Sequence, residues 1–147
     1  SPSPRLELLH VGSLGPHHPR RRELVEPLLR RQRVPFRHAT TRNANEAAQL
    51  YAQHTLALNV PLNQDLNHRL FEVMAAGVPQ VIFGDRNLLG DNSPLANRRD
   101  LFWANSIEEL ENLVQRLFAH PNELKSISVE PPPYWDLRAL LKAALTP

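Results

Sequence analysis

Short apolar segments alternate with amphipathic segments along most of the chain, and this alternation constrains the fold more than any other feature. Buried parallel strands occur as short, nearly continuous apolar runs, and helices connect such strands through right-handed crossovers. The expected strands are 6–13, 34–39, 55–60, 80–83 and 101–104, and the expected helices are 19–31, 43–54, 67–76, 106–121 and 134–145. The alternation predicts an α/β fold with a mostly parallel sheet flanked by helices.

Residues that begin or end helices lie at the expected boundaries. A Ser-x-x-Glu capping box is present at 106–109, and Asn43 or Asn45 is suited to cap the helix that follows it. Gly77 is expected to stop its helix in the left-handed conformation, and Pro79 follows just beyond the stop. These signals predict where the chain passes from helix to strand.

The first expected helix has one irregular position. Leu24, Leu28 and Leu29 have helical spacing, which predicts that they face the core. Pro27 lies inside the same segment, and an internal proline is expected to kink or shorten a helix.

The composition excludes several kinds of protein. The chain has no cysteine, so disulfides, thiolate metal sites and cysteine nucleophiles are excluded. No apolar run approaches the ~20 residues of a membrane-spanning helix, and no signal peptide is recognisable, so we expect a cytoplasmic protein. The 147 residues predict a single domain, 1–147, with a flexible tail at 1–5. Because the chain opens on "SPSPR" without Met, we expect it to be a piece of a longer protein.

The positive charge is concentrated in the first part of the chain. Residues 1–42 hold nine Arg and three Glu, a net charge of +6, whereas residues 43–147 hold eight basic and twelve acidic residues, a net charge of −4. A basic region suits an anionic ligand, nucleic acid or a membrane surface, but it can also be a set of solvated arginines. Phe36 is the sole Phe, Tyr or Trp residue in the basic region, which disfavours nucleic acid because base stacking needs aromatic side chains.

Ligands of open parallel sheets bind beyond the carboxyl ends of the strands. The loops expected there are 12–20, 60–68 and 84–100. In the first loop, Gly12 allows a ligand to approach the backbone, and the amides at a helix N-terminus suit an anion. The run Arg20–Arg22 adds three cations near the same helix start. These residues fit either an anion site or an exposed charge run.

Arg69 lies in the first turn of helix 67–76, where a cation opposes the helix dipole. Arg69 and Glu72 could form a simple i,i+3 ion pair on the surface, worth ~0.2–0.5 kcal/mol. Alternatively, Arg69 binds an anion while Glu72 accepts hydrogen bonds from ligand hydroxyls. The residues alone leave both interpretations open. The buried stripe of this helix is expected to consist of Leu70, Val73 and Met74.

Motifs of several enzyme classes are missing. The sequence has no G-x-G-x-x-G or Walker motif, no G-x-S-x-G elbow, no H-E-x-x-H and no D-x-D pair. We therefore expect no metal site. His10, His38, His54 and His120 have no recognisable partners and are expected to be structural or surface residues. The adjacent His17 and His18 have no nearby carboxylate and are expected to be loop residues rather than metal ligands.

Taken together, four segments resemble one family. Their order is "HVGS…HPRRRELVEPLL", "LYAQHTLALNV", "NHRLFEVMAAGVPQVI" and "SIEELENLVQRLFAHPNEL". They resemble the C-terminal half of GT-B glycosyltransferases of the group 1 type, and most of all the spore-coat glycosyltransferase-like branch. The resemblance covers about residues 8–145. Its most specific part consists of Arg69, Phe71, Glu72, Ala75, Gly77 and Pro79.

The resemblance implies a Rossmann-like domain that binds a nucleoside diphosphate sugar as substrate, with no further cofactor and no metal. It implies that Gly12, Ser13 and Arg21 lie by the diphosphate and that Glu72 meets the ribose hydroxyls. Asn67 and Arg69 are then expected near the phosphates or the sugar. The donor-binding set implied in this way is Gly12, Ser13, Arg21, Asn67, Arg69 and Glu72, and the catalytic residues stay unassigned.

The resemblance implies an active site between two domains, and we expect the N-terminal acceptor-binding domain to be missing from these 147 residues. The expected partners are therefore a nucleotide sugar and the missing GT-B domain, or other domains of a longer chain. The isolated domain is not expected to turn over. The alternative is a non-catalytic interaction module that retains the glycosyltransferase fold.

Overall fold

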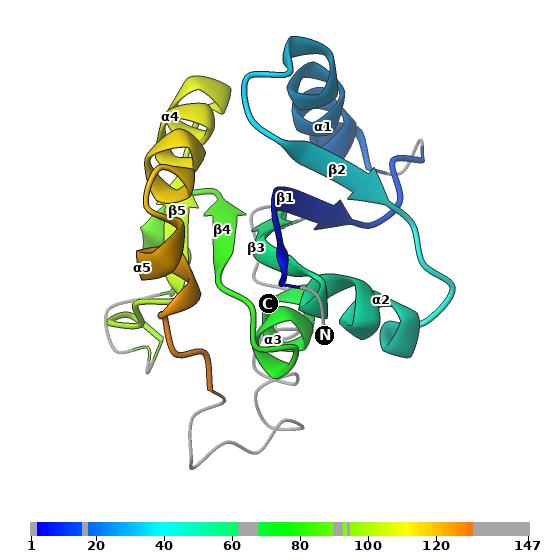
Figure 1. Cartoon of the computed structure of the whole chain (residues 1–147). Helices are drawn as coiled ribbons and strands as arrows, with labels where there is room; N and C mark the ends of the chain where they lie inside the picture. Colours follow the sequence, from blue (N-terminus) through cyan, green and yellow to red (C-terminus); the bar gives the residue numbers. More distant parts are fainter. Residues whose placement is uncertain (1–2, 16–17, 62–67, 90–92, 94, 131–147) are drawn as a thin grey trace.

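The computed structural model describes residues 3–15, 18–61, 68–89, 93 and 95–130 (Figure 1). Five strands alternate with helices along this part of the chain. In chain order the elements are β1 (Arg5–Val11), α1 (Pro19–Arg31), β2 (Phe36–Ala39), α2 (Ala44–Ala52), β3 (His54–Asn59), α3 (His68–Ala75), β4 (Gln80–Phe83), η2 (Arg86–Leu89), β5 (Leu101–Ala104), α4 (Ile107–Phe118) and α5 (Pro121–Lys125).

The five strands form one sheet in the order β2-β1-β3-β4-β5, and every neighbouring pair is parallel. The predicted α/β fold is therefore confirmed, and it is Rossmann-like. β5, over the segment 101–104, lies at an edge of the sheet. All six residues of the central strand β3 are buried, because helices cover both faces of the sheet.

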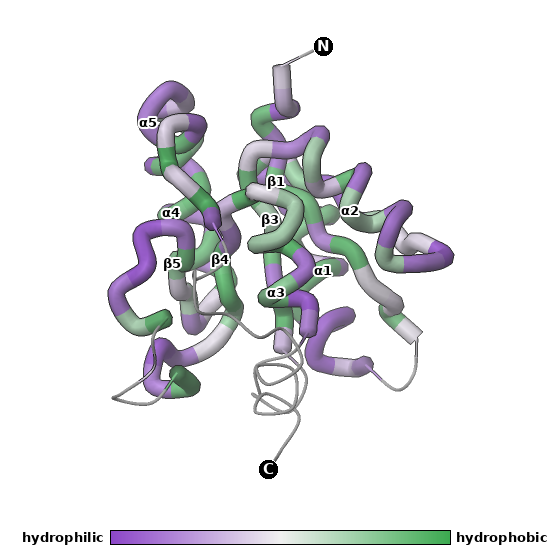
Figure 2. The backbone as a smooth tube through the Cα atoms, turned by 90° about the horizontal axis from the view of Figure 1, so that it is seen from below, coloured by the Kyte–Doolittle hydropathy of each residue, from purple (hydrophilic) through white to green (hydrophobic). Residues whose placement is uncertain are grey.

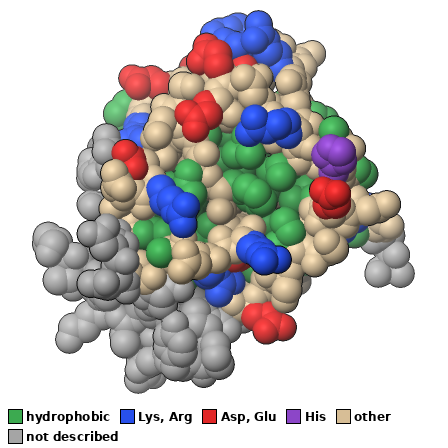
Figure 3. All heavy atoms as spheres, turned by 90° about the vertical axis from the view of Figure 1, so that its left-hand side faces the viewer, with side chains coloured by type: hydrophobic (Ala, Val, Ile, Leu, Met, Phe, Trp, Pro, Cys, Tyr) green, Lys and Arg blue, Asp and Glu red, His purple; other side chains and the backbone are tan. Residues whose placement is uncertain are grey.

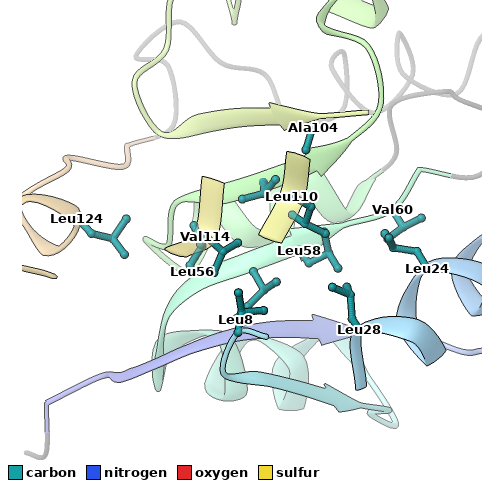
Figure 4. Packing of buried hydrophobic residues seen from close by; sticks show 12 residues of the cluster. Leu8, Leu24, Leu28, Leu56, Leu58, Val60, Ala104, Leu110, Val114 and Leu124 are labelled. Carbon is teal, nitrogen blue, oxygen red and sulfur yellow. The ribbon is translucent and has the colours of Figure 1, made fainter. Parts of the chain in front are cut away.

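Helices cover the sheet on both faces (Figure 1). One face packs against α1, α4 and α5, where Leu28, Val114 and Leu124 meet the strand residues Leu8 and Leu56 (Figure 4). The other face packs against α2 and α3 through two further clusters of buried side chains. The backbone coloured by hydropathy shows hydrophobic residues concentrated along the strands (Figure 2). Figure 3 shows hydrophobic side chains ringed by charged ones on the side of the molecule where α4, α5 and β5 lie.

The helix ends follow the predicted signals. Asn43 caps α2, and its side chain accepts a 2.9 Å hydrogen bond from the backbone N–H of Glu46. Ser106 caps α4 in the same way, but the carboxylate of Glu109 accepts from Asn105 N–H rather than from that of the cap residue. The capping box is thus displaced by one residue on its return bond.

Gly77 ends α3 as expected. Its φ is 78°, in the left-handed region where glycine avoids strain. The backbone N–H of Gly77 bonds Met74 O, and that of Val78 bonds Val73 O, which together form a Schellman motif. The chain then enters β4 at Gln80.

Helix α1 runs through Pro27 to Arg31 and is not shortened. Leu24 and Leu28 face the core as predicted, but the prediction for Leu29 was wrong because its side chain is 41% exposed. Arg31 joins α1 to α4: its Nε and Nη2 donate to the two carboxylate oxygens of Glu111 at 3.1 and 2.8 Å. Glu111 is buried in this contact.

The sequence did not separate α5 from the helix before it. The expected helix 106–121 ends at Phe118, and α5 begins separately at Pro121. The expected loop 84–100 contains the helical turn η2. The expected terminal helix 134–145 and the tail residues 1–2 lie outside the described residues. No helix in the described part of the chain is long and apolar enough to cross a membrane.

Candidate functional site

A small recess lies where β1 and β3 end, and polar side chains from several elements converge on it. Its polar residues are His10, Arg21, Tyr51, Asn59 and Arg69. The chain leaves β1 toward one neighbour, β2, and returns to place β3 on the other side of β1. Ligands of open parallel sheets bind at this switch point. The recess has about the room of one water molecule.

Arg21 reaches the recess from the first turn of α1. Its side chain is buried, and Nε donates a 3.3 Å hydrogen bond to Val60 O. Burial lowers the pKa of Arg21, and the nearby positive charge of Arg69 lowers it further. Two guanidinium groups therefore lie close enough to repel each other, and an anion between them would relieve that repulsion.

Gly12 follows β1 and lies against Arg21. Its φ is 152°, and a Cβ atom at this position would lie 3.2 Å from Nη1 of Arg21 and 3.5 Å from Cε1 of His10. Glycine is therefore needed here for both its backbone conformation and its lack of a side chain. Gly12 was expected to let a ligand approach the backbone, and in this structure the group that lies against it is the guanidinium of Arg21.

Arg69 and Glu72 form the predicted i,i+3 pair, with 3.2 Å between Nη1 and Oε2. Both side chains are only about a quarter exposed, at 24% and 28%. Burial raises the pKa of Tyr51, and the charge of Arg69 acts in the opposite direction, which places Arg69 beside the buried phenol. The pair therefore lies at the recess and is not a free surface pair. With Arg21 added, two cations face one carboxylate.

His10 and His38 are stacked at the ends of β1 and β2. Their Nδ1 atoms are 2.9 Å apart and the ring centroids 5.1 Å apart. Burial lowers the pKa of His10 to about 3, with further contributions from the charges of His38, Arg21 and Arg69. Burial also lowers the pKa of His38. The prediction that these residues have no partner was wrong.

His54 also has partners, because its Nδ1 is 2.9 Å from Leu50 O and its Nε2 is 3.1 Å from Oε1 of Glu7. It lies at the start of β3, away from the recess, and its contacts join β3 to α2 and β1. The prediction of no partner was wrong for His54 as well.

Two buried amides at the site were missed by the sequence interpretation. Nδ2 of Asn59 donates to Oε1 of Gln80 at 3.2 Å, and Nε2 of Gln80 donates to Leu70 O at 3.0 Å. The signal was present, because Asn59 and Gln80 are polar residues inside apolar strand segments. A polar residue in a fully buried strand needs hydrogen-bond partners.

The remaining expected residues have different positions. Ser13 is exposed, and its hydroxyl accepts a bond from Gly15 N–H rather than facing the recess. Within the run Arg20–Arg22, Arg21 is the member that lines the recess. Arg20 contacts Phe83, and Arg22 bonds Leu14 O. Asn67 and His17 lie outside the described residues. The described residues contain no group of three His, Asp or Glu side chains that could hold a metal ion.

A parallel sheet with a cationic recess at its switch point defines a Rossmann-like domain suited to an anionic ligand. Residues 20–130 match the model of the glycosyl transferase-like family, which is most of the chain, so the protein belongs to this family. The matched segment includes Arg21, Arg69 and Glu72. No curated protein and no solved structure matches the chain. Family membership supports a function of the glycosyltransferase type.

Proposed function

We propose that this domain binds the nucleotide-sugar donor of a glycosyltransferase, as the C-terminal half of a GT-B enzyme of the group 1 type. The family match and the motif from Arg69 to Pro79 support a glycosyltransferase. The resemblance to the spore-coat branch supports the narrower assignment. The donor would lie at the switch point, across the ends of β1 and β3.

The observation that carries the proposal is the convergence of Arg21 and Arg69. They come from different helices and lie close enough to affect each other's charge, and among the described residues a carboxylate, Glu72, is paired with Arg69 but none with Arg21. A diphosphate supplies the negative charge that this arrangement lacks, and arginine binds phosphate oxygens through paired N–H groups. Glu72, with a 28% exposed carboxylate, would accept hydrogen bonds from the ribose hydroxyls.

Negative charge develops on the leaving nucleoside diphosphate when the sugar is transferred. Arg21 and Arg69 would stabilise this charge in place of a metal ion. Gly12 would let the ligand approach the backbone, and Ser13 and Asn67 stay in the proposal as further donor contacts near the phosphates or the sugar. The proposal needs no cofactor besides the nucleotide sugar. Because the active site of a GT-B enzyme lies between two domains, this domain alone should bind a donor without turning it over.

The test is the change in melting temperature on adding nucleoside diphosphates and nucleotide sugars. At 100-fold over Kd the bound ligand should stabilise the domain by about 2.7 kcal/mol, which corresponds to a shift of several degrees. Arg69→Ala and Glu72→Ala should remove the shift. Arg42→Ala is the matched control, because Arg42 forms an exposed i,i+4 pair with Glu46 on α2 and should leave the shift unchanged.

The absence of a shift with every nucleotide of a broad panel would contradict donor binding by this domain. It would favour a non-catalytic interaction module that retains the glycosyltransferase fold. A shift that survives both Arg69→Ala and Glu72→Ala would place the ligand somewhere other than the recess.

A further inference from the structure

Asn59 has an acceptor that the folded chain leaves unused. The residue is 4% exposed, lies at the end of β3 and lines the recess. Its Oδ1 is buried and has no hydrogen-bond partner among the residues that the structure describes. A buried carbonyl oxygen without a donor destabilises the folded state, so such an atom calls for an explanation.

Hydrogen bonds to Gln80 and Leu70 fix the orientation of the Asn59 amide. The carbonyl of Leu70 can only accept, so the Gln80 amide turns its NH₂ group toward it at 3.0 Å. The carbonyl of Gln80 then faces Asn59 and accepts from Nδ2 at 3.2 Å. Rotating the Asn59 amide would set its Oδ1 against Oε1 of Gln80, so that two acceptors would face each other. In this chain of hydrogen bonds, Oδ1 of Asn59 is therefore the acceptor that is left without a donor.

Neither Arg21 nor Arg69 donates a hydrogen bond to Oδ1 of Asn59. Nε of Arg21 donates to Val60 O, and Nη1 of Arg69 donates to Glu72. The recess therefore presents two guanidinium groups and one neutral acceptor side by side. A ligand that satisfies all three carries an anionic group next to a hydrogen-bond donor.

The surroundings restrict the chemistry of that donor. An ammonium group is disfavoured because Arg21 and Arg69 would repel it. The group that donates to the buried Oδ1 must itself be small, since the recess has about the room of one water molecule, and this disfavours a ring N–H of a nucleobase. A hydroxyl group is neutral, donates a hydrogen bond and has the size of a water molecule.

We propose that Oδ1 of Asn59, held by Gln80, accepts a hydrogen bond from a ligand hydroxyl next to the phosphates that Arg21 and Arg69 bind. Asn59 is thus a specificity-determining residue that selects a hydroxyl-bearing phosphate ester over a simple phosphate anion. The inference rests on the proposed function, because it concerns the same recess. The hydroxyl belongs either to the ribose or to the transferred sugar.

The test compares ligands by titration calorimetry. The probes are uridine and guanosine diphosphates, their deoxyribose counterparts, their glucose-linked forms and inorganic pyrophosphate. Asn59→Leu should lower the affinity for the hydroxyl-bearing ligand by about tenfold and change the affinity for pyrophosphate by less than about twofold. A loss of affinity for the ribonucleotide but not for its deoxy form identifies the ribose hydroxyl as the donor. A loss of affinity confined to the glucose-linked form identifies a hydroxyl of the transferred sugar as the donor.

Asn59→Ser is the second variant, in case leucine prevents folding, and it shortens the side chain so that the acceptor no longer reaches the ligand. The matched control is Thr55→Val, which removes a buried hydroxyl bonded to Arg5 O at the other end of the same strand. Equal losses for pyrophosphate and the nucleotides, or no loss for any ligand, would overturn the role of Asn59. If the wild-type domain binds no nucleotide at all, the proposed function fails and this inference fails with it.

Discussion

Two arginine–glutamate pairs in this molecule differ in how completely their charges are matched. Arg31 places two N–H groups on the two oxygens of Glu111, at 3.1 and 2.8 Å, and joins two helices. Arg69 makes one contact with Glu72 within a single helix, at 3.2 Å, and Arg21 adds a second cation beside it. Arg31 also lies 3.9 Å from Glu108, and Arg33 lies 3.9 Å from Glu111, so two arginines face two carboxylates in this cluster. The Arg69–Glu72 pair, with Arg21 beside it, leaves positive charge in excess, which is the arrangement on which the proposed donor site rests.

The substitution with the largest expected effect on stability breaks the Arg31–Glu111 pair. Arg31→Met leaves the carboxylate of Glu111, 3% exposed, without its bidentate partner and with only the 3.9 Å contact to the exposed Arg33. A buried charge that loses its main partner is strongly destabilising, so the free energy of unfolding should fall by about 3 kcal/mol. Urea denaturation measures this change. Ligand-induced stabilisation of the folded fraction should persist, and its loss would show that the two pairs are not independent.

The second effect concerns the pH dependence at the recess. The pKa of His10 is about 3 in the folded protein against an ordinary value of 6.5. Between these values the unfolded chain binds more protons than the folded one, so stability is complete above about pH 6.5 and falls as the pH decreases. From about pH 6.5 to about pH 5.5 the loss due to His10 should be about 1 kcal/mol. The lowered pKa of His38 acts in the same direction.

Urea denaturation at these two pH values, with His10→Gln beside the wild type, measures this contribution. The variant should lose less stability on acidification than the wild type does. Equal losses in the two proteins would show that the pH dependence originates in other groups and not at the recess.

The substitution with the smallest expected effect on stability breaks the Arg69–Glu72 pair. Arg69→Ala removes one contact of a partly exposed pair and also removes the repulsion with Arg21, so the free energy of unfolding should change by less than about 1 kcal/mol. Urea denaturation in the absence of ligand checks this value. A loss as large as that of Arg31→Met would make the Arg69–Glu72 pair a structural contact and remove the contrast between the two.

Local signals were sufficient to predict most of the fold. The bounds of α1 and β4 match the predicted segments 19–31 and 80–83, because proline, glycine and apolar spacing act within a few residues. The local signals could not show that a new short helix starts at Pro121, since this depends on how Leu124 packs in the core.

The site was predicted only in part, for a related reason. Arg21, Arg69 and Glu72 were identified because they follow a motif or a charge run. The contact between His10 and His38 joins residues 28 positions apart, and the Asn59–Gln80 contact joins residues 21 positions apart. Such contacts arise from the pairing of strands, which a reading of one segment at a time does not specify. Both could have been proposed once the strands were placed side by side.

The glycine stop of α3 has a consequence for chain length. Four residues, 76–79, connect the end of α3 at Ala75 to the start of β4 at Gln80. Successive strand residues point to opposite faces of a sheet. Inserting or deleting one residue here would turn the Gln80 amide away from both Leu70 and Asn59 while leaving the composition of the segment almost unchanged. Homologous proteins that keep this amide pair should therefore vary in sequence at this connection but not in its number of residues.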